Sequence, residues 1–344
     1  MVAAAALMAA GFPAPGAPPS ASQPEATRLT IAASGDFLIH TPVAAQALAN
    51  GGGERYDFAP MFRPVRRWIE GADLALCHVE TPLVAGPPAG YPSFRTPPDL
   101  VRAIRATGWD ACSTASNHSL DGGQPGIDST IRALRGAGIA FDGTASSPRG
   151  RRRFPILEAG GARVAFLSYT AVSNGQLVPH PWSLNWAGPR RILADAHTAR
   201  ARGADTVIVN LHWGAEYQHA PSPQQLSLAR KLTRSPDVTA IVGQHVHVVQ
   251  PIRRVNGKIV VFGEGNLVSN QSGACCPTES QDGLIALLRL VVDQSGARVI
   301  RVRYLPVWVR HPDYAVVPAP PDSFARTLAF VGRRPYLRPV RPRN

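Results

Sequence analysis

The chain has 344 residues, of which 44% are apolar and 17% charged, and it contains 31 Gly and 33 Pro. It is too apolar for a disordered protein and lacks the Gly-x-y repeat of collagen. No apolar run reaches the roughly 18–20 residues of a membrane-spanning helix, which excludes a polytopic membrane protein. A chain of this length can bury a large core, as one large domain or as two.

The formal charge is +13, and all but two of the 36 basic residues are arginines. This excess gives a mild attraction to polyanions such as phosphate esters, wall polymers, membrane surfaces or nucleic acid. The densest arginine runs are Arg149 with 151–153 and a proline-interleaved tail at 333–343, which we interpret as a solvated extension. The sequence has no zinc-finger, RNA-recognition or helix-turn-helix pattern, so nucleic acid is not the partner that we expect.

The first 27 residues differ in composition from the rest of the chain. An apolar stretch at 2–12, of signal-peptide length, is followed by a Pro/Ala/Ser/Gly-rich linker, and no basic residue precedes Arg28. We interpret 1–27 as a signal-like or tethering segment and expect an exported, extracytoplasmic protein that this segment could hold at the membrane. The composition leaves a disordered Ala/Pro leader open as the alternative.

The four cysteines show no metal-finger spacing. Cys77 and Cys112 lie in apolar, strand-like runs, and we interpret both as buried, unreactive thiols. Cys275 and Cys276 are adjacent in a polar loop, where export would permit a disulfide. Sequence alone does not determine the pairing.

From Arg28 onward, short apolar runs typical of strands alternate with helical stretches. We predict strands at 28–34, 73–80, 110–114, 154–158, 163–169, 205–211, 238–243, 258–262, 284–291 and 298–309. We predict helices at 60–70, 98–107, 124–137, 190–202 and 222–234. Alternation followed by consecutive strands indicates one large α/β domain over 28–310, with a Pro/Arg-rich extension at 311–344.

Side chains able to bind metal ions follow five of the predicted strands, and α/β folds build their sites at strand ends. They are Asp36; His78 and Glu80; Asn117 beside His118; His212 followed by Glu216; and His245 with His247. Each is unremarkable alone, because an Asp after a strand is usually a turn residue and a single His is usually a polar core residue. Together they suit divalent Mn, Fe, Zn or Co, and a bridging carboxylate among imidazoles favours a two-metal hydrolytic site.

These residues lie in segments that resemble the CapA family of bacterial capsule or poly-γ-glutamate synthesis proteins, within the calcineurin-like metallophosphoesterase superfamily. The matching segments, in family order, are GDFLIH (35–40), HVETPL (78–83), FRTPPDLVRAIRATGWDACSTASNHSLDGG (94–123), NLHWGAEYQHAPSPQQLSLARKL (210–232), GQHVHVVQPI (243–252) and GEGNLVSNQ (263–271). The resemblance implies a CapA-like metallophosphoesterase domain at 28–310, folded as a single four-layer αββα sandwich.

The resemblance also implies a role for each matched residue. The implied metal ligands are Asp36, the bridging Glu80, Asn117, His212, His245 and His247. His118 would protonate the leaving oxygen after a metal-bridging hydroxide attacks. Glu216 would orient an imidazole or lie at the surface, and Asp121 would contact the site or cap a turn.

Three positions depart from the family pattern, one of them being Gly263-Glu264-Gly265-Asn266, where a Ser-Leu-Gly-Asn-like run is common. The first motif has Asp36-Phe37-Leu38 where phosphoesterases usually carry Asp-x-His, which puts full occupancy of two metal sites in question. His78 replaces the usual asparagine before the bridging glutamate. Since His78 and Glu80 leave the same face of one strand, His78 could supply the missing imidazole or play a structural role. His40 is a more remote substitute.

The sequence therefore predicts a metal-dependent hydrolase-fold protein that acts on a cell-envelope polyanion of capsule or poly-γ-glutamate type, or on its precursor. Capsule or polymer synthesis machinery is the expected protein partner, and two divalent ions are the expected cofactors. The alternative is a non-catalytic polymer-binding or assembly protein that keeps a structural metal. A nucleic-acid phosphodiesterase is a third hypothesis, based on the arginine excess.

Overall fold

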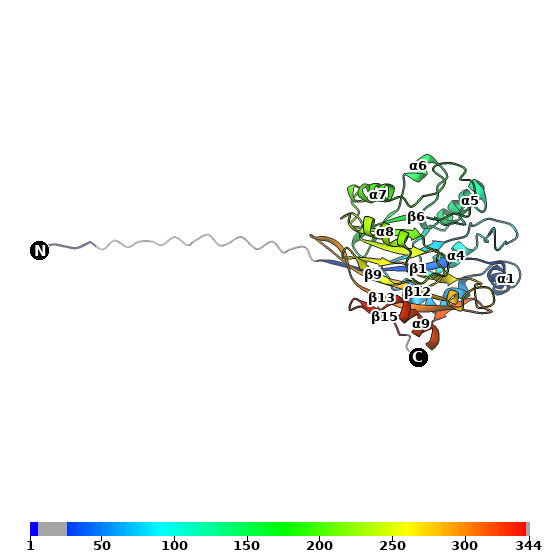
Figure 1. Cartoon of the computed structure of the whole chain (residues 1–344). Coiled ribbons are helices and arrows are strands. Elements are labelled where there is room, and N and C mark those ends of the chain that lie inside the picture. Colours follow the sequence, from blue (N-terminus) through cyan, green and yellow to red (C-terminus); the bar gives the residue numbers. More distant parts are fainter. Residues whose placement is uncertain (6–25, 342–344) are drawn as a thin grey trace.

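Two β-sheets lie face to face at the centre of the computed structural model, which describes residues 1–5 and 26–341 (Figure 1). The leader predicted at 1–27 lies almost entirely outside the described residues. Among those that are described, no helix is both long and apolar enough to cross a bilayer.

The first sheet orders its strands β14-β13-β12-β1-β2-β3-β4, with β11 beside β1 and β15 beside β13. Its strands are β1 Thr27–Phe37, β2 Leu74–Val79, β3 Ala111–Ser113, β4 Ala140–Asp142, β11 Asn266–Val268, β12 Asp282–Asp293, β13 Gly296–Arg310, β14 Ala315–Pro318 and β15 Leu337–Pro339. Strands β1 to β4 run parallel, whereas β12, β13 and β14 pair in antiparallel fashion. The consecutive strands expected after the alternating part of the chain include the antiparallel pair β12 and β13.

The second sheet has the order β5-β6-β7-β8-β10-β9. Its strands are β5 Ile156–Ala159, β6 Ala162–Thr170, β7 Thr206–His212, β8 Ala240–Gln244, β9 Ile252–Val255 and β10 Lys258–Val261. Its four central strands are parallel, so β7 and β8 end at the same edge.

The helices cover the outer faces of the two sheets. They are α1 Thr41–Asn50, α2 Ala59–Phe62, α3 Arg66–Glu70, α4 Leu100–Thr107, α5 Gly123–Gly136, α6 Pro148–Arg151, α7 Pro189–Ala201, α8 Pro223–Thr233 and α9 Pro321–Val331. The helix predicted at 60–70 is interrupted by a 3₁₀ turn at Arg63–Val65, because Pro64 has no N–H to donate to the preceding turn. Helix α8 begins as expected, with a capping box between Ser222 and Gln225.

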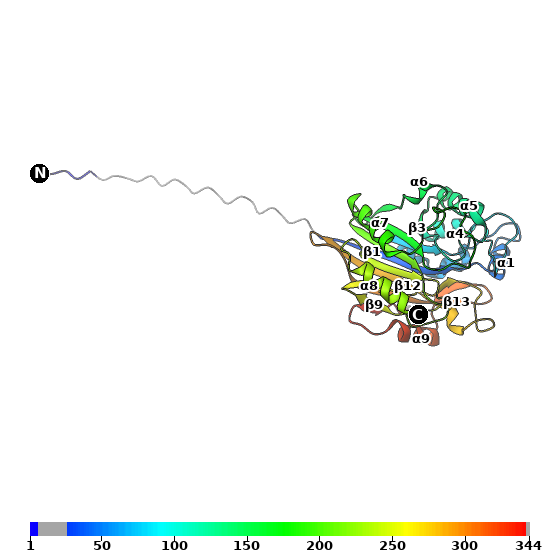
Figure 2. The same ribbon diagram turned by 45° about the horizontal axis from the view of Figure 1, so that its top comes forward.

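Alternation along the central strands places apolar side chains on both faces of each sheet. In β1, Ile31 points into the core between the sheets and Ala32 faces the helices outside the first sheet. In β6, Phe166 belongs to the inter-sheet core and Leu167 packs with residues of α7 and α8. The four-layer αββα sandwich predicted for a single large domain is therefore confirmed (Figures 1 and 2).

The fold continues past residue 310. Strands β14 and β15 both pair with β13, and Val316 and Leu337 are buried. On α9, the Arg326 guanidinium donates hydrogen bonds to both carboxylate oxygens of Asp282, at 2.8 and 3.0 Å. This differs from the separate Pro/Arg-rich extension expected at 311–344, and the burial of Leu337 differs from the solvated tail expected at 333–343. Strands β14 and β15 are short and form by pairing with β13, so the local, proline-rich sequence does not predict them.

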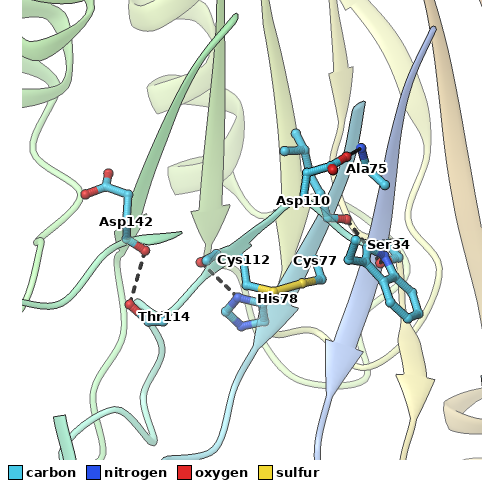
Figure 3. Close-up of a disulfide and its surroundings, with 11 residues drawn as sticks. Ser34, Ala75, Cys77, His78, Asp110, Cys112, Thr114 and Asp142 are labelled. Atoms are coloured by element: carbon cyan, nitrogen blue, oxygen red, sulfur yellow. Dashed lines mark hydrogen bonds between the residues drawn. A yellow bond between two sulfur atoms is a disulfide. The ribbon is translucent and has the colours of Figure 1, made fainter. Parts of the chain in front are cut away.

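A disulfide joins Cys77 of β2 to Cys112 of β3 (Figure 3). The interpretation of these residues as unreactive thiols is corrected by this finding. The parallel register places Cys77 directly opposite Cys112, with Cα atoms 4.4 Å apart, which is within reach of a disulfide. Cys275 and Cys276, whose pairing the sequence left open, are free thiols.

The double variant Cys77→Ala/Cys112→Ala should lower the free energy of unfolding by about 4 kcal/mol, because this crosslink restricts the unfolded chain. The bridged cysteines are 35 positions apart in sequence. Denaturant titration without and with a reductant measures the effect, which reductant should abolish. The matched control is Cys275→Ala/Cys276→Ala, which should unfold like the parent protein. Equal stability of the two double variants would contradict a stabilising disulfide.

Candidate metal centre

The carboxyl ends of the parallel strands from both sheets meet at one site. The register of β1 and β2 pairs Asp36 with His78, and Glu80 directly follows β2. On the second sheet, His212 ends β7 and is paired with Gln244, the residue before His245. The site is therefore built from segments far apart in sequence.

Side chains at this site form four groups whose possible ligand atoms lie within 4.8 Å of one another. The groups are Asp36, His78 and His212; Glu80, His212 and His245; Asp36, Glu80 and His247; and Glu216, His245 and His247. Except for Glu216, every member is buried. The structure thus brings together the predicted ligands Asp36, Glu80, His212, His245 and His247, with His78 among them.

Several polar atoms of this cluster are buried without a hydrogen-bond partner. They are Nε2 of His78, both carboxylate oxygens of Glu80, Nδ1 of His212 and Nδ1 of His245. An unpaired buried acceptor costs about 1–3 kcal/mol, and buried polar groups are normally satisfied. A divalent cation would satisfy carboxylate and imidazole acceptors together, so the donor set fits such an ion. Its buried Asp, Glu and His side chains point to divalent metal binding.

The backbone around Asp36 is fixed by glycine. A Cβ on Gly35 would lie 1.8 Å from the carbonyl oxygen of Gly265, so only glycine permits this close approach. The Asp36 N–H then donates to the same carbonyl at 3.1 Å. Across the site, His245 and His247 have φ angles of 92° and 56°, values that L-residues rarely adopt. Such strained positions concentrate at functional sites.

His247 is held by two acceptors on one side of its ring. Its Nδ1 lies 3.1 Å from Asp36 Oδ2 and 3.1 Å from Asn266 Oδ1, and Nε2 lies 3.8 Å from Glu80 Oε1. Burial opposes a charge on His247, but the Glu80 and Asp36 carboxylates outweigh it and raise its pKa to about 9. A cation at this site would have to displace that proton.

Glu80 and Asn117 both lie near Nε2 of His212, with Glu80 Oε1 at 4.0 Å and Asn117 Oδ1 at 2.8 Å. Burial raises the pKa of the Glu80 carboxyl well above its usual value, since no donor satisfies either oxygen. Burial also holds the pKa of His212 well below normal, and its Nε2 donates to Asn117 Oδ1 at 2.8 Å. The Asn117 amide nitrogen donates to Asn174 Oδ1 at 3.1 Å, which keeps Oδ1 turned toward His212.

His78 lies inside the cluster, at the position where the sequence left two readings open. Its Nε2 is 3.8 Å from Asp36 Oδ1, and its Nδ1 is 3.0 Å from Ser113 Oγ. Burial lowers the pKa of His78 to about 4, although Asp36 acts in the opposite direction. The imidazole is therefore neutral at physiological pH, as a metal ligand must be.

Two further residues named from the sequence are also placed. Glu216 is exposed, yet its carboxylate reaches the same group as His245 and His247. His40 lies outside the four groups, and its Nδ1 is 3.1 Å from the Leu38 carbonyl. This geometry favours His78 over His40 as the additional imidazole.

His118 lies beside the cluster but belongs to none of its four groups. Its Nδ1 donates to Asp121 Oδ2 at 2.9 Å, and the ring of Phe94 packs edge-on against it with centroids 4.6 Å apart. Asp121 also accepts hydrogen bonds from the Phe94 N–H at 2.7 Å and from Gln176 Nε2 at 2.8 Å. We call His118 and Asp121 the acid pair.

Sequence reasoning missed the residues that orient the ones it found. Asn174 and Gln176 lie in the loop between β6 and α7 and hold Asn117 and Asp121, and no motif marks them. Asn266 was visible inside the segment GEGNLVSNQ, but nothing local indicated its contact with His247. A side chain that only orients another functional residue leaves no recognisable motif in the sequence.

The fold and this site define a metallophosphoesterase-like protein. The crystal structure of the calcineurin-like phosphoesterase YfkN from Bacillus subtilis aligns over 88% of this chain and 96% of that one, with a TM-score of 0.52 and 16% identity. A profile of the bacterial capsule synthesis protein family PGA_cap matches residues 30–271. The chain belongs to this family, and the resemblance inferred from its motifs is confirmed.

Two relatives carry names that describe polymer synthesis. Capsule biosynthesis protein CapA of Bacillus anthracis is 26% identical over 289 residues, which is 81% of this chain and 67% of that protein. A probable polyglutamine synthesis accessory protein of Mycobacterium tuberculosis is 29% identical over 230 residues, covering 63% of this chain. The match spans only 60% of that mycobacterial protein.

Metal content should separate the ligands from the acid pair. His247→Ala should bind less metal because it removes a buried ligand, and His78→Asn should weaken one of two metal sites. His118→Ala should keep the parent's metal content, because His118 lies outside the groups of ligand atoms. Equilibrium dialysis with Mn²⁺ and elemental analysis measure stoichiometry and affinity, and thermal melts check folding. If His118→Ala lost metal as fully as His247→Ala, these roles would be wrong.

The metal-free protein should lose stability as the pH falls from about 6.5 toward 4. The folded-state pKa of His78 lies near 4 and its ordinary value is 6.5, so the unfolded chain binds more protons in this window. One such group lowers the free energy of unfolding by up to about 1.4 kcal/mol per pH unit. His78→Asn should flatten this fall, measured by urea titration of chelator-treated protein at several pH values. Parallel curves for parent and variant would contradict the assignment.

Proposed function

We propose that this protein is a metal-dependent hydrolase of an anionic cell-envelope polymer of the capsule or polyglutamate type, or of its precursor. One observation carries the proposal: a buried cluster of unpaired carboxylate and imidazole acceptors lies beside a histidine that is paired to a carboxylate. Metal ligands alone would suit a structural ion. A separate acid pair is what bond cleavage requires.

The ligand side chains would hold one or two divalent ions. Asp36, His78 and His212 form one possible set of ligands, and Glu80 belongs both to a set with His212 and His245 and to a set with Asp36 and His247. When bound, divalent cations lower the pKa of water and offset the negative charge that develops in the transition state. Mn, Fe and Zn all match these donors. Asn117 would add an amide oxygen, which Asn174 keeps in orientation.

The acid pair supplies the proton for the leaving group. Asp121 accepts the Nδ1 proton of His118 and fixes the orientation of the ring, so Nε2 is the atom that would pass a proton to the leaving group. Phe94 packs on the ring, and Gln176 fixes the other oxygen of Asp121. These contacts restrict His118 to one orientation, so its proton is directed toward one side of the substrate.

A second function is supported by a specific observation in the first motif. Leu38, at the third position of the Asp36-Phe37-Leu38 motif, is buried and cannot bind a metal, so this strand end supplies a single ligand. A protein with an incomplete site could bind the polymer without cleaving it and keep a structural metal. Both the hydrolase and the polymer-binding proposal include export of the protein. The Cys77–Cys112 disulfide supports export, because disulfides persist in oxidising compartments.

Leaving-group chemistry tests the proposal. His118→Ala should lower turnover of an alkyl phosphodiester by about 10²–10⁴-fold, because an alkoxide needs a proton to leave. Bis-p-nitrophenyl phosphate should lose much less, since p-nitrophenolate leaves without one. His197→Ala, on the exposed outer helix α7, is the control.

Mass spectrometry of polyglutamate and phosphate-linked wall polymers incubated with the Mn²⁺-loaded protein would identify the bond that breaks. Equal losses on both esters would refute the acid role of His118. The absence of turnover on every ester and polymer by a metal-loaded parent protein would favour the binding function.

A further inference from the structure

A cleft of about 430 Å³ opens immediately beside the acid pair. Phe94 and Asp121 form part of its wall, and these residues contact the His118 ring from the other side. Arg95, in the loop before α4, and Arg132, on α5, also line the cleft. The cleft therefore lies directly beside the acid pair.

The cleft is positively charged. Arg95 and Arg132 are both exposed, and within residues 26–341 neither forms a salt bridge with a carboxylate. Asp121 is the only acidic side chain in the lining, and three hydrogen bonds already satisfy its oxygens. The Asp121 carboxylate interacts with His118, so the guanidinium groups of Arg95 and Arg132 make the electrostatic potential in the cleft positive.

Reaction geometry determines which part of a substrate would lie here. A general acid must reach the leaving atom within hydrogen-bond distance, so the leaving part of the substrate departs on the His118 side of the cluster. The cleft adjoins His118 through Phe94 and Asp121. In a polymer substrate, the leaving part is a further stretch of charged chain and needs a binding surface of its own.

We propose that this cleft binds the leaving part of an anionic polymer, with Arg95 and Arg132 pairing with carboxylates or phosphates of successive units. This inference rests on the proposed hydrolase function and assigns it a substrate class: a chain that carries anionic groups beyond the bond that is cleaved. Guanidinium groups suit both anions, since each can form paired hydrogen bonds with carboxylate or phosphate oxygens.

The arginine-rich region seen first in the sequence provides the matched control. A second cleft, of about 440 Å³, is lined by Arg135, Arg149 and Arg153. None of the metal-cluster or acid-pair residues lines it. Both clefts are basic, so a comparison between them separates a specific site from general attraction by a protein of charge +13.

The test measures polymer binding and does not use turnover. Fluorescently labelled polyglutamate is titrated with the Mn²⁺-loaded parent, with Arg95→Gln/Arg132→Gln and with the control Arg149→Gln/Arg153→Gln. Loss of two charge-assisted pairs should weaken binding by the cleft variant about tenfold, and by the control less than about twofold. Arg95→Lys/Arg132→Lys should recover part of the affinity. Repetition with polyphosphate shows which anion the cleft prefers, and thermal melts check folding.

Equal weakening in the cleft variant and the control would overturn the proposal, because it would indicate general charge attraction. Unchanged binding by Arg95→Gln/Arg132→Gln would overturn it as well. Selective weakening supports it even if the parent protein never cleaves the polymer, in which case the hydrolase function alone would fail. The two proposals can therefore be refuted separately.

Discussion

The candidate metal centre is defined by a set of buried hydrogen-bond acceptors for which the described residues provide no donor. Both oxygens of Glu80 and one ring nitrogen each of His78, His212 and His245 lack hydrogen-bond partners. Folding leaves these groups in a water-poor site because the hydrophobic strands behind them pack in two sheets. These unpaired acceptors suit a divalent cation, and their burial without partners opposes the stability of the metal-free fold.

The loss of the usual histidine after the first aspartate illustrates how a parallel sheet allows substitution. Leu38 stands at the position of that histidine and is buried, so this strand end gains apolar packing there in place of a ligand. The neighbouring strand carries His78 in register with Asp36, and its ring reaches the same carboxylate. An imidazole can enter one metal site from either of two adjacent strands, because their ends are only about 4.8 Å apart.

The metal cluster and the acid pair are separate because they lie on different segments of the chain. The cluster sits on strand ends that are fixed by ladder hydrogen bonds in both sheets. The acid pair lies between β3 and α5, and Gln176 from the β6–α7 loop crosses from the second sheet to hold it. The relative position of acid and cluster therefore depends on the packing of the two sheets. Arg95 and Arg132 line the cleft that adjoins the acid pair.

The sequence by itself determined ten of the strands and the kinds of side chain at their ends, but it did not indicate β4, β9, β11, β14 or β15. Hydrophobic runs are local, and a polar residue that follows a buried strand can be recognised without knowing its neighbours. The family motifs added the four-layer sandwich and the ligand set, and the groups containing Asp36, Glu80, His212, His245 and His247 lie together as those motifs imply.

Only the tertiary structure decided which of these residues touch. The Cys77–Cys112 bridge and the approach of His78 to Asp36 follow from the register of adjacent strands, which no local pattern encodes. The pairing of β15 with β13 is likewise set by a partner strand, so the arginine-rich tail did not indicate it. Asn174 and Gln176 act through other residues from a distant loop. Contacts between segments far apart in the chain depend on packing, and packing is a property of the whole fold.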